Sequence, residues 1–214
     1  MKATTSISLL QQWLSPHYLE KDFLSRAVRT FSLAKPFPHL ILRDFLLPEK
    51  LSLIEKALSL EKFQLKDADL FTFFQTNDLV GTKNKVLQEF RTFLCSPEFV
   101  SLISSITGVE LINNKIDLAG TLYTLTHHLL THDDQVEKRR VAFMLYFSSL
   151  EKKEGGALAL YNRCDGRANM IQKRIFPRRN TFIFFMVSKV SFHEVEEVIS
   201  AKERIALSGW FYDQ

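Results

Sequence analysis

A histidine and an aspartate one residue apart, with a second histidine far along the chain, form a candidate metal-binding set. These residues are His132, Asp134 and His193. Two imidazoles and one carboxylate on one face of a metal, with the other face open, are typical of non-haem Fe(II) sites. In extended backbone, residues i and i+2 point the same way, so His132 and Asp134 are expected to share one metal while Asp133 points elsewhere. A His-x-Asp pair alone arises often by chance, so the pair needs support.

An arginine eleven residues after His193 provides that support. The segment 200–203 between them is a plausible turn, so we expect His193 and Arg204 on neighbouring antiparallel strands that face one cavity. A guanidinium binds a carboxylate through two parallel hydrogen bonds, and the distal carboxylate of 2-oxoglutarate is such a group. The alternative is that Arg204 only begins a strand and pairs with Glu196 or Glu197.

The elements that must position these residues divide the chain into a supporting region, 1–115, and a β-rich core, 116–214. The core alternates β-branched and aromatic runs with turn clusters, a spacing typical of a sandwich or barrel. Ser96, Pro97 and Gly108 predict the two ends of one helix. Other helices are expected at 19–32, 48–60 and 83–94, and strands at 117–126, 139–149, 157–161, 169–174, 181–188, 192–199 and 204–212. We expect one α+β, mainly β domain over 1–214, with a helical layer packed on a β-sandwich core.

The composition predicts a soluble protein with a rigid aromatic interior. The 214 residues are 46% hydrophobic and include 19 Phe but only 7 Gly. Cys95 and Cys164 are too few for a disulfide framework, which favours a reducing compartment. The longest apolar run, 141–147, is far shorter than the ~20 residues of a membrane span, and no secretory signal pattern is present. We therefore expect a cytoplasmic protein without a membrane segment.

The net charge of +4 is too small to indicate nucleic-acid binding, and no nucleic-acid motif is present. Basic clusters occur at 138–140, 173–174 and 178–179. They are interpreted as solvated faces and strand ends, with docking to an acidic or RNA-rich target as the alternative. His127 and His128 have no assigned role and are expected to be exposed loop residues.

The order of Tyr123, His132-x-Asp134, His193 and Arg204 resembles the prolyl-hydroxylase-like branch of the 2-oxoglutarate/Fe(II) oxygenases. The likeness is strongest to the ribosomal-protein and translation-factor prolyl hydroxylases, in a single-domain form. It covers roughly residues 35–213 through six blocks: PFPHLILRDFL, RRVAFMLYFS, EGGALALY, NTFIFFMVS, SFHEVEEV and RIALSGWFY. The ordered set of blocks is much more specific than any single pair.

The resemblance implies a double-stranded β-helix (jelly-roll, cupin-like) core and a role for each residue of the pattern. His132, Asp134 and His193 fall on the iron ligands, and Arg204 falls on the residue that binds the 2-oxoglutarate tail. Tyr123 falls on a tyrosine whose hydroxyl reaches the cosubstrate, and the alternative is a barrel-filling aromatic. Strand parity places Trp210 on the same inner face as Arg204, where it either walls the pocket or fills the core.

The resemblance also implies a dioxygenase with Fe(II) and 2-oxoglutarate as cofactors and ascorbate in support. The expected reaction hydroxylates a C–H bond, most simply in a prolyl residue of a ribosomal protein or translation factor, with succinate and CO2 as co-products. The protein is expected to be a monomer or homodimer. Three alternatives stay open: the same fold acting on another side chain or small molecule, a non-catalytic cupin-like metal-binding module, and a hydrolytic zinc site.

Overall fold

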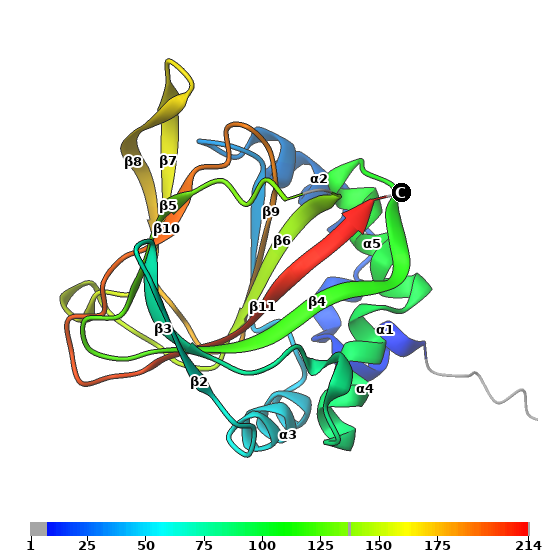
Figure 1. Cartoon of the computed structure of the whole chain (residues 1–214). Coiled ribbons are helices and arrows are strands. Elements are labelled where there is room, and N and C mark those ends of the chain that lie inside the picture. The colour runs from blue at the N-terminus through cyan, green and yellow to red at the C-terminus, as the bar shows by residue number, and fades with distance from the viewer. Residues whose placement is uncertain (1–7, 137, 214) are drawn as a thin grey trace, which may run out of the picture.

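The computed structural model describes residues 8–136 and 138–213, and within them eleven strands form one curled antiparallel sheet (Figure 1). The strand order is β1-β9-β6-β11-β4-β3-β5-β10-β7-β8, and β2 pairs with β3. The strands are β1 His39–Arg43, β2 Gln64–Ala68, β3 Phe71–Gln75, β4 Leu111–Tyr123, β5 His128–His132, β6 Arg139–Tyr146, β7 Leu158–Cys164, β8 Arg167–Ile175, β9 Thr181–Met186, β10 His193–Val195 and β11 Arg204–Asp213. The mainly β prediction is therefore confirmed.

The curled sheet has two walls. The major wall consists of β1, β9, β6, β11 and β4, and the minor wall consists of β5, β10, β7 and β8. Strand β3 joins them, since its Phe74 pairs with Leu122 of β4 and its Phe71 pairs with Leu129 of β5. The two walls thus face each other, and side chains from both can reach one interior.

The helical layer packs on the outer face of the major wall (Figure 1). Burial of aromatic side chains holds the two layers together, as the many Phe residues predict. Phe45 stacks on Phe182 of β9 with ring centroids 4.5 Å apart, and Phe99 meets Phe211 of β11 at 6.3 Å. The helices are α1 Leu9–Trp13, α2 Phe23–Leu33, α3 Pro48–Leu58, α4 Lys85–Leu94 and α5 Pro97–Thr107. Among the described helices, none combines the length and apolar character that a membrane crossing requires.

Helix α5 begins and ends where its capping residues predict. The Ser96 side chain accepts a hydrogen bond from the Phe99 backbone N–H at 3.2 Å, and Pro97 occupies the first helical position. Gly108 ends the helix with φ of 74°, a left-handed conformation that glycine adopts without strain. The 3.2 Å hydrogen bond also satisfies one of the free amides at the start of the helix.

One strand of the minor wall was absent from the sequence prediction. The expected strand at 117–126 ends earlier, at Tyr123, and β5 follows at His128–His132. The prediction that His127 and His128 are exposed loop residues is therefore wrong in two respects, the exposure of His127 and the loop position of His128, although His127 does precede the strand. His127 is buried with its ring 5.2 Å from that of Phe74, and His128 begins β5. Pairing of β5 with β3 and β10, which no local pattern encodes, makes this segment a strand.

In each wall, one row of directly paired residues runs from strand to strand at the level of the predicted metal ligands. The two rows come together at the edge strands β8 and β1, where Lys173 Nζ lies 2.8 Å from His39 Nε2. The rows consist of His132, His193, Leu160 and Lys173 in the minor wall, and of Asp117, Trp210, Ala142, Phe185 and His39 in the major wall.

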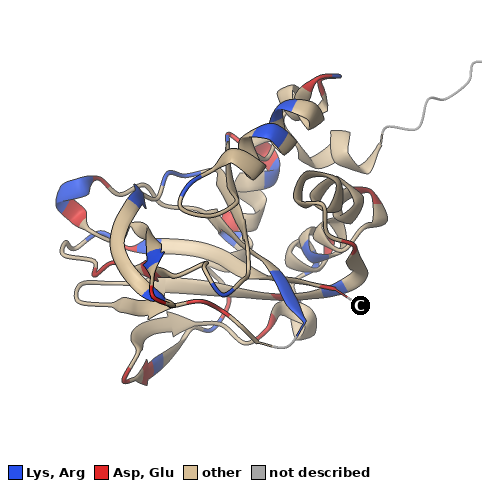
Figure 2. Cartoon of the chain, turned by 90° about the horizontal axis from the view of Figure 1, so that it is seen from above, with Lys and Arg blue, Asp and Glu red and all other residues tan. Residues whose placement is uncertain are grey.

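Basic and acidic residues are interspersed along the ribbon (Figure 2). Each predicted basic cluster has a member in an ion pair: Arg140 with Asp213, Arg174 with Glu196, and Arg179 with Glu55. This partial neutralisation favours the interpretation of the clusters as solvated faces.

Close packing of β11 on β4 yields a first prediction. A Cβ atom on Gly209 would lie 1.8 Å from the backbone oxygen of Asp117. Gly209→Ala is expected to lower the free energy of unfolding by about 3 kcal/mol, the upper end of the cost of overpacking a core. Gly81→Ala is the matched control, because the space around Gly81 is open, and its cost should stay within about 0.5 kcal/mol. Equal urea-denaturation curves for the two variants would contradict the packing.

Candidate metal and carboxylate site

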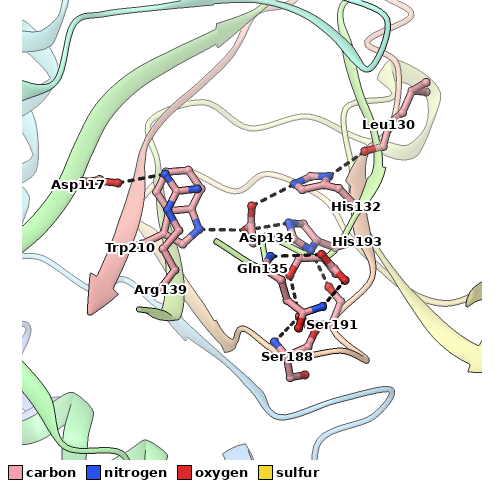
Figure 3. Close-up of polar contacts among 11 residues, drawn as sticks. Asp117, Leu130, His132, Asp134, Gln135, Arg139, Ser188, Ser191, His193 and Trp210 are labelled. Atoms are coloured by element: carbon pink, nitrogen blue, oxygen red, sulfur yellow. Dashed lines mark hydrogen bonds and ion pairs between the residues drawn. The ribbon is translucent and has the colours of Figure 1, made fainter. Parts of the chain in front are cut away.

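The three predicted metal ligands converge where β5 ends and β10 begins (Figure 3). His132 ends β5 and His193 begins β10, and the two are register partners with ring centroids 4.2 Å apart. Asp134 Oδ1 lies 3.4 Å from His132 Nε2, and Asp134 Oδ2 lies 3.4 Å from His193 Nε2. One ligand atom from each residue falls within 4.8 Å of the others, so the three fit a single metal ion.

Asp134 reaches this position by a different route from the one that strand alternation predicts. It lies beyond the end of β5, and its φ of 60° is left-handed and not extended. A turn therefore aims its carboxylate at the histidines. Asp133 does point elsewhere, as expected, because its side chain accepts hydrogen bonds from the Gln135 backbone N–H and from the Gln135 side-chain amide.

Backbone carbonyls fix the orientation of both imidazoles. His132 Nδ1 lies 2.8 Å from the oxygen of Leu130, and His193 Nδ1 lies 2.8 Å from the oxygen of Ser191. A carbonyl oxygen only accepts, so each Nδ1 carries a proton, and in the neutral ring each Nε2 is left with a lone pair on the side of Asp134. Two nitrogen lone pairs and a carboxylate aimed at one point are a donor set for a cation, and outer hydrogen bonds of this kind are usual for histidine ligands.

Electrostatics keeps the carboxylate ionised. Burial opposes ionisation of Asp134, but the contacts with His132 and His193 outweigh it and hold the pKa of this carboxyl well below its usual range. Burial also opposes protonation of His132, yet hydrogen bonding to Asp134 and the charge of that carboxylate raise the His132 pKa above 6.5. The contact between Asp134 and His132 therefore stabilises the metal-free fold most between roughly pH 4 and 6.5. This contribution is lost as the pH falls through the lowered pKa of Asp134, and as it rises through the raised pKa of His132.

Arg204 is buried, and no carboxylate of the described residues pairs with it. Its side chain is 2% exposed, its Nε donates to the Gly156 oxygen at 3.0 Å, and its Nη2 donates to the Tyr146 hydroxyl at 3.1 Å. No ion pair among residues 8–136 and 138–213 includes it. The alternative pairing with Glu196 is wrong, because Glu196 pairs with Arg174 at 2.8 Å.

Two tyrosine rings flank the guanidinium. The Arg204 Cζ atom lies 4.9 Å from the Tyr123 ring centroid and 5.0 Å from that of Tyr146. Burial raises the pKa of both phenols, although the Arg204 charge opposes this rise. Both hydroxyls are therefore neutral near pH 7, and the arginine charge is left for an anionic ligand to neutralise.

The expected neighbouring-strand relation between His193 and Arg204 is wrong, although both face one cavity. Strand β10 pairs with β5 and β7, while β11 pairs with β4 and β6, so the two residues belong to opposite walls. They line one pocket with Asp134, Tyr123 and Trp210, which confirms that Trp210 shares the inner face with Arg204. The cavity of about 90 Å³ greatly exceeds the ~10–15 Å³ that one water needs.

Tyr146 is the polar residue that sequence reasoning missed. It lies on β6 in register with Ala206 of β11, and its hydroxyl accepts from Arg204 and donates to the sulfur of Met144 at 3.0 Å. Ala142, Met144 and Tyr146 lie on one face of β6 and pack in one cluster. Residues 141–146 are all buried and apolar or aromatic, so only strand parity with these neighbours could have indicated Tyr146.

Comparisons with known proteins show what this chain is similar to. A model of the 2OG-Fe(II) oxygenase superfamily matches residues 118–212. The chain is 41% identical over 182 residues to a Xenopus laevis protein named prolyl 3-hydroxylase OGFOD1, which covers 83% of this chain and 35% of that protein. It is 30% identical to the prolyl 3,4-dihydroxylase OGFOD1 of Ostreococcus tauri, covering 89% of this chain and 41% of that protein. The chain thus spans well under half the length of these relatives.

Solved structures show the same fold at low identity. A Pseudomonas putida prolyl-4-hydroxylase superposes with a TM-score of 0.68 at 17% identity, covering 89% of this chain and 99% of that one. A Trichoplax adhaerens prolyl hydroxylase, bound to a hypoxia inducible factor peptide fragment, gives 0.67 at 15% identity, covering 93% and 96%. The predicted double-stranded β-helix is therefore confirmed. Residues 118–212 thus resemble the 2OG-Fe(II) oxygenase superfamily, which is named for Fe(II) and 2-oxoglutarate.

The His132–Asp134 contact yields a second prediction. Because Asp134 raises the His132 pKa, an NMR titration of the metal-free protein should give a His132 midpoint above 6.5. Asp134→Asn removes the negative charge and should lower that midpoint. A divalent metal competes with the same proton, so metal affinity should fall as the pH drops. Identical midpoints in the two proteins would show that the carboxylate does not act on His132.

Proposed function

We propose that this chain is an Fe(II)- and 2-oxoglutarate-dependent dioxygenase that hydroxylates a prolyl residue of a protein. The observation that carries the proposal is the joint presence, in one pocket, of a His-Asp-His metal set and a buried guanidinium that has no anionic partner in the described part of the chain. A metal set alone fits many activities. A metal set facing an unneutralised arginine fits a cosubstrate that combines a metal-chelating end with a distal carboxylate.

Each residue has a distinct role in this proposal. His132, Asp134 and His193 hold Fe(II) through two neutral imidazoles and one carboxylate. Arg204 binds the distal carboxylate of 2-oxoglutarate. Tyr123 lies beside Arg204 as its register partner, so its protonated hydroxyl is placed to reach the same cosubstrate.

The protein supplies position and shielding, while the bound cofactors supply the chemistry. Bound Fe(II) and 2-oxoglutarate provide O2 activation, with succinate and CO2 as co-products and ascorbate in support. The Nδ1 hydrogen bonds keep His132 and His193 in the tautomer that presents Nε2. Apolar side chains of Leu129, Phe185 and Val195 line the pocket beside these polar groups and limit the water that enters.

The substrate assignment rests on the relatives. Those reported above are named prolyl hydroxylases, and one solved neighbour holds a peptide fragment. We propose a prolyl residue in a ribosomal protein or translation factor, modified in the cytoplasm by one oxygenase domain that spans this chain as a monomer or homodimer. Both cysteines are free, which agrees with a reducing compartment.

The alternatives are less consistent with the site. A hydrolytic zinc centre could use the same three ligands, but it would leave the buried charge of Arg204 without a purpose. A non-catalytic module would have no need to retain all three ligands together with this arginine. An oxygenase of the same fold acting on another side chain keeps every residue role and differs only in the substrate.

Turnover of 2-oxoglutarate tests the proposal. Purified protein with Fe(II), ascorbate, O2 and 2-oxoglutarate is expected to form succinate, and Asp134→Ala should abolish this. Arg204→Met should raise the KM for 2-oxoglutarate at least about tenfold, since a hydrogen bond to a charged group contributes about 1.5–3 kcal/mol. Arg178→Met, at an exposed arginine, is the matched control and should behave as wild type.

The outcomes separate the competing functions. Iron-dependent succinate would direct the search to translation proteins that gain one oxygen atom in mass. Thermal stabilisation by 2-oxoglutarate without turnover would mean that the protein substrate is required. If 2-oxoglutarate neither reacts nor stabilises the protein, the oxygenase proposal is wrong and the binding-module alternative replaces it.

A further inference from the structure

Asp134 differs from the other two proposed metal ligands because it lies outside the strands. His132 and His193 are strand residues, whereas Asp134 lies in the loop between β5 and β6 with a left-handed backbone. Its side chain is nevertheless only 9% exposed. A loop backbone cannot by itself fix the rotation of a carboxylate, so the orientation of this ligand must come from contacts with other elements.

The contact is made by Trp210. Its indole Nε1 donates a hydrogen bond to Asp134 Oδ2 at 3.0 Å (Figure 3). Trp210 lies on β11, between β4 and β6, where it pairs with Asp117 and Ala142. An indole N–H is only a donor, so it always matches an ionised carboxylate. A side chain on a central strand thus holds a ligand that a loop presents.

The face of the Trp210 indole ring is in turn contacted by Arg139. The Arg139 guanidinium carbon lies 3.6 Å from the Trp210 ring centroid, which is a close cation–π contact. Arg139 Nη2 lies 3.1 Å from Asp117 Oδ2, and the Tyr212 hydroxyl donates to the same oxygen. In Figure 3 a chain of contacts runs from Asp117 through Arg139 and Trp210 to Asp134, on one side of the histidines.

We propose that Trp210 is a positioning residue for the metal, acting through Asp134, and that Arg139 acts through Trp210. The inference rests on the proposed function, because it requires Asp134 to be a metal ligand. The competing role for Trp210 is that of a wall that only fills space. The two roles differ in one respect: a space-filling wall needs the ring, whereas a positioning residue needs the N–H.

Manganese(II) titration of the protein, followed by EPR of the free ion, separates these roles. Trp210→Phe keeps a ring and removes the N–H, and should lower Mn(II) affinity by about 10–100-fold, the usual effect of losing an outer hydrogen bond to a ligand. Arg139→Met should lower it less. Trp13→Phe, at the tryptophan packed in the helical layer, is the control and should leave affinity unchanged.

NMR of the indole N–H groups gives a readout that does not depend on the Trp210→Phe variant. The chain has two tryptophans, so Trp13→Phe assigns both indole resonances. The Trp210 indole resonance of the metal-free wild type should lie downfield, and Asp134→Ala should move it upfield. An unmoved resonance would show that the hydrogen bond is absent and would overturn the inference, whether or not Trp210→Phe folds.

The outcomes distinguish this inference from the proposed function. If wild type binds Mn(II), Asp134→Ala loses it and folded Trp210→Phe retains full affinity, the positioning role is wrong and the metal site stands. If wild type does not bind Mn(II), or Asp134→Ala binds it equally well, the metal site is wrong and both proposals fail.

Discussion

The buried, unneutralised charge of Arg204 is the constraint on which the pocket depends. A guanidinium removed from water costs several kcal/mol unless opposite charge or well-placed hydrogen bonds offset it. Among the described residues, the hydrogen-bond partners of Arg204 are neutral: the Gly156 carbonyl, the Tyr146 hydroxyl and the Met144 sulfur. The fold holds the charge in place through β11 and through the 155–156 turn, where a Cβ on Gly155 would lie 2.1 Å from the Glu197 oxygen. The pocket is thus prepared for an anion before any ligand arrives.

The remaining site follows from how the two walls face each other. Register pairing places His132 and His193 side by side in the minor wall, and Trp210 at the same level of the major wall. Asp134 joins the two, since its carboxylate contacts both histidines and accepts from the indole. The strand-borne groups are fixed by the sheet, and the loop-borne carboxylate is fixed by the groups around it.

Local signals predicted much of this arrangement, and long-range pairing explains the rest. The boundaries of α5 follow from Ser96, Pro97 and Gly108, because capping is a local interaction. The pocket residues His132, Asp134, His193 and Arg204 were found through spacing and family resemblance. Strand β5, the left-handed Asp134 and the opposite-wall placement of His193 and Arg204 were not, because they depend on which distant strands pair. Tyr146 was missed because a tyrosine in an apolar strand looks like core.

The most direct test of the account is an anaerobic crystal structure of the protein with Mn(II) and 2-oxoglutarate. The account predicts one metal ion bonded to Nε2 of His132, Nε2 of His193 and a carboxylate oxygen of Asp134. It also predicts the distal carboxylate of 2-oxoglutarate against the Arg204 guanidinium. A metal ion bound elsewhere, or an Arg204 that keeps only its Gly156 and Tyr146 contacts while 2-oxoglutarate lies outside the pocket, would contradict it.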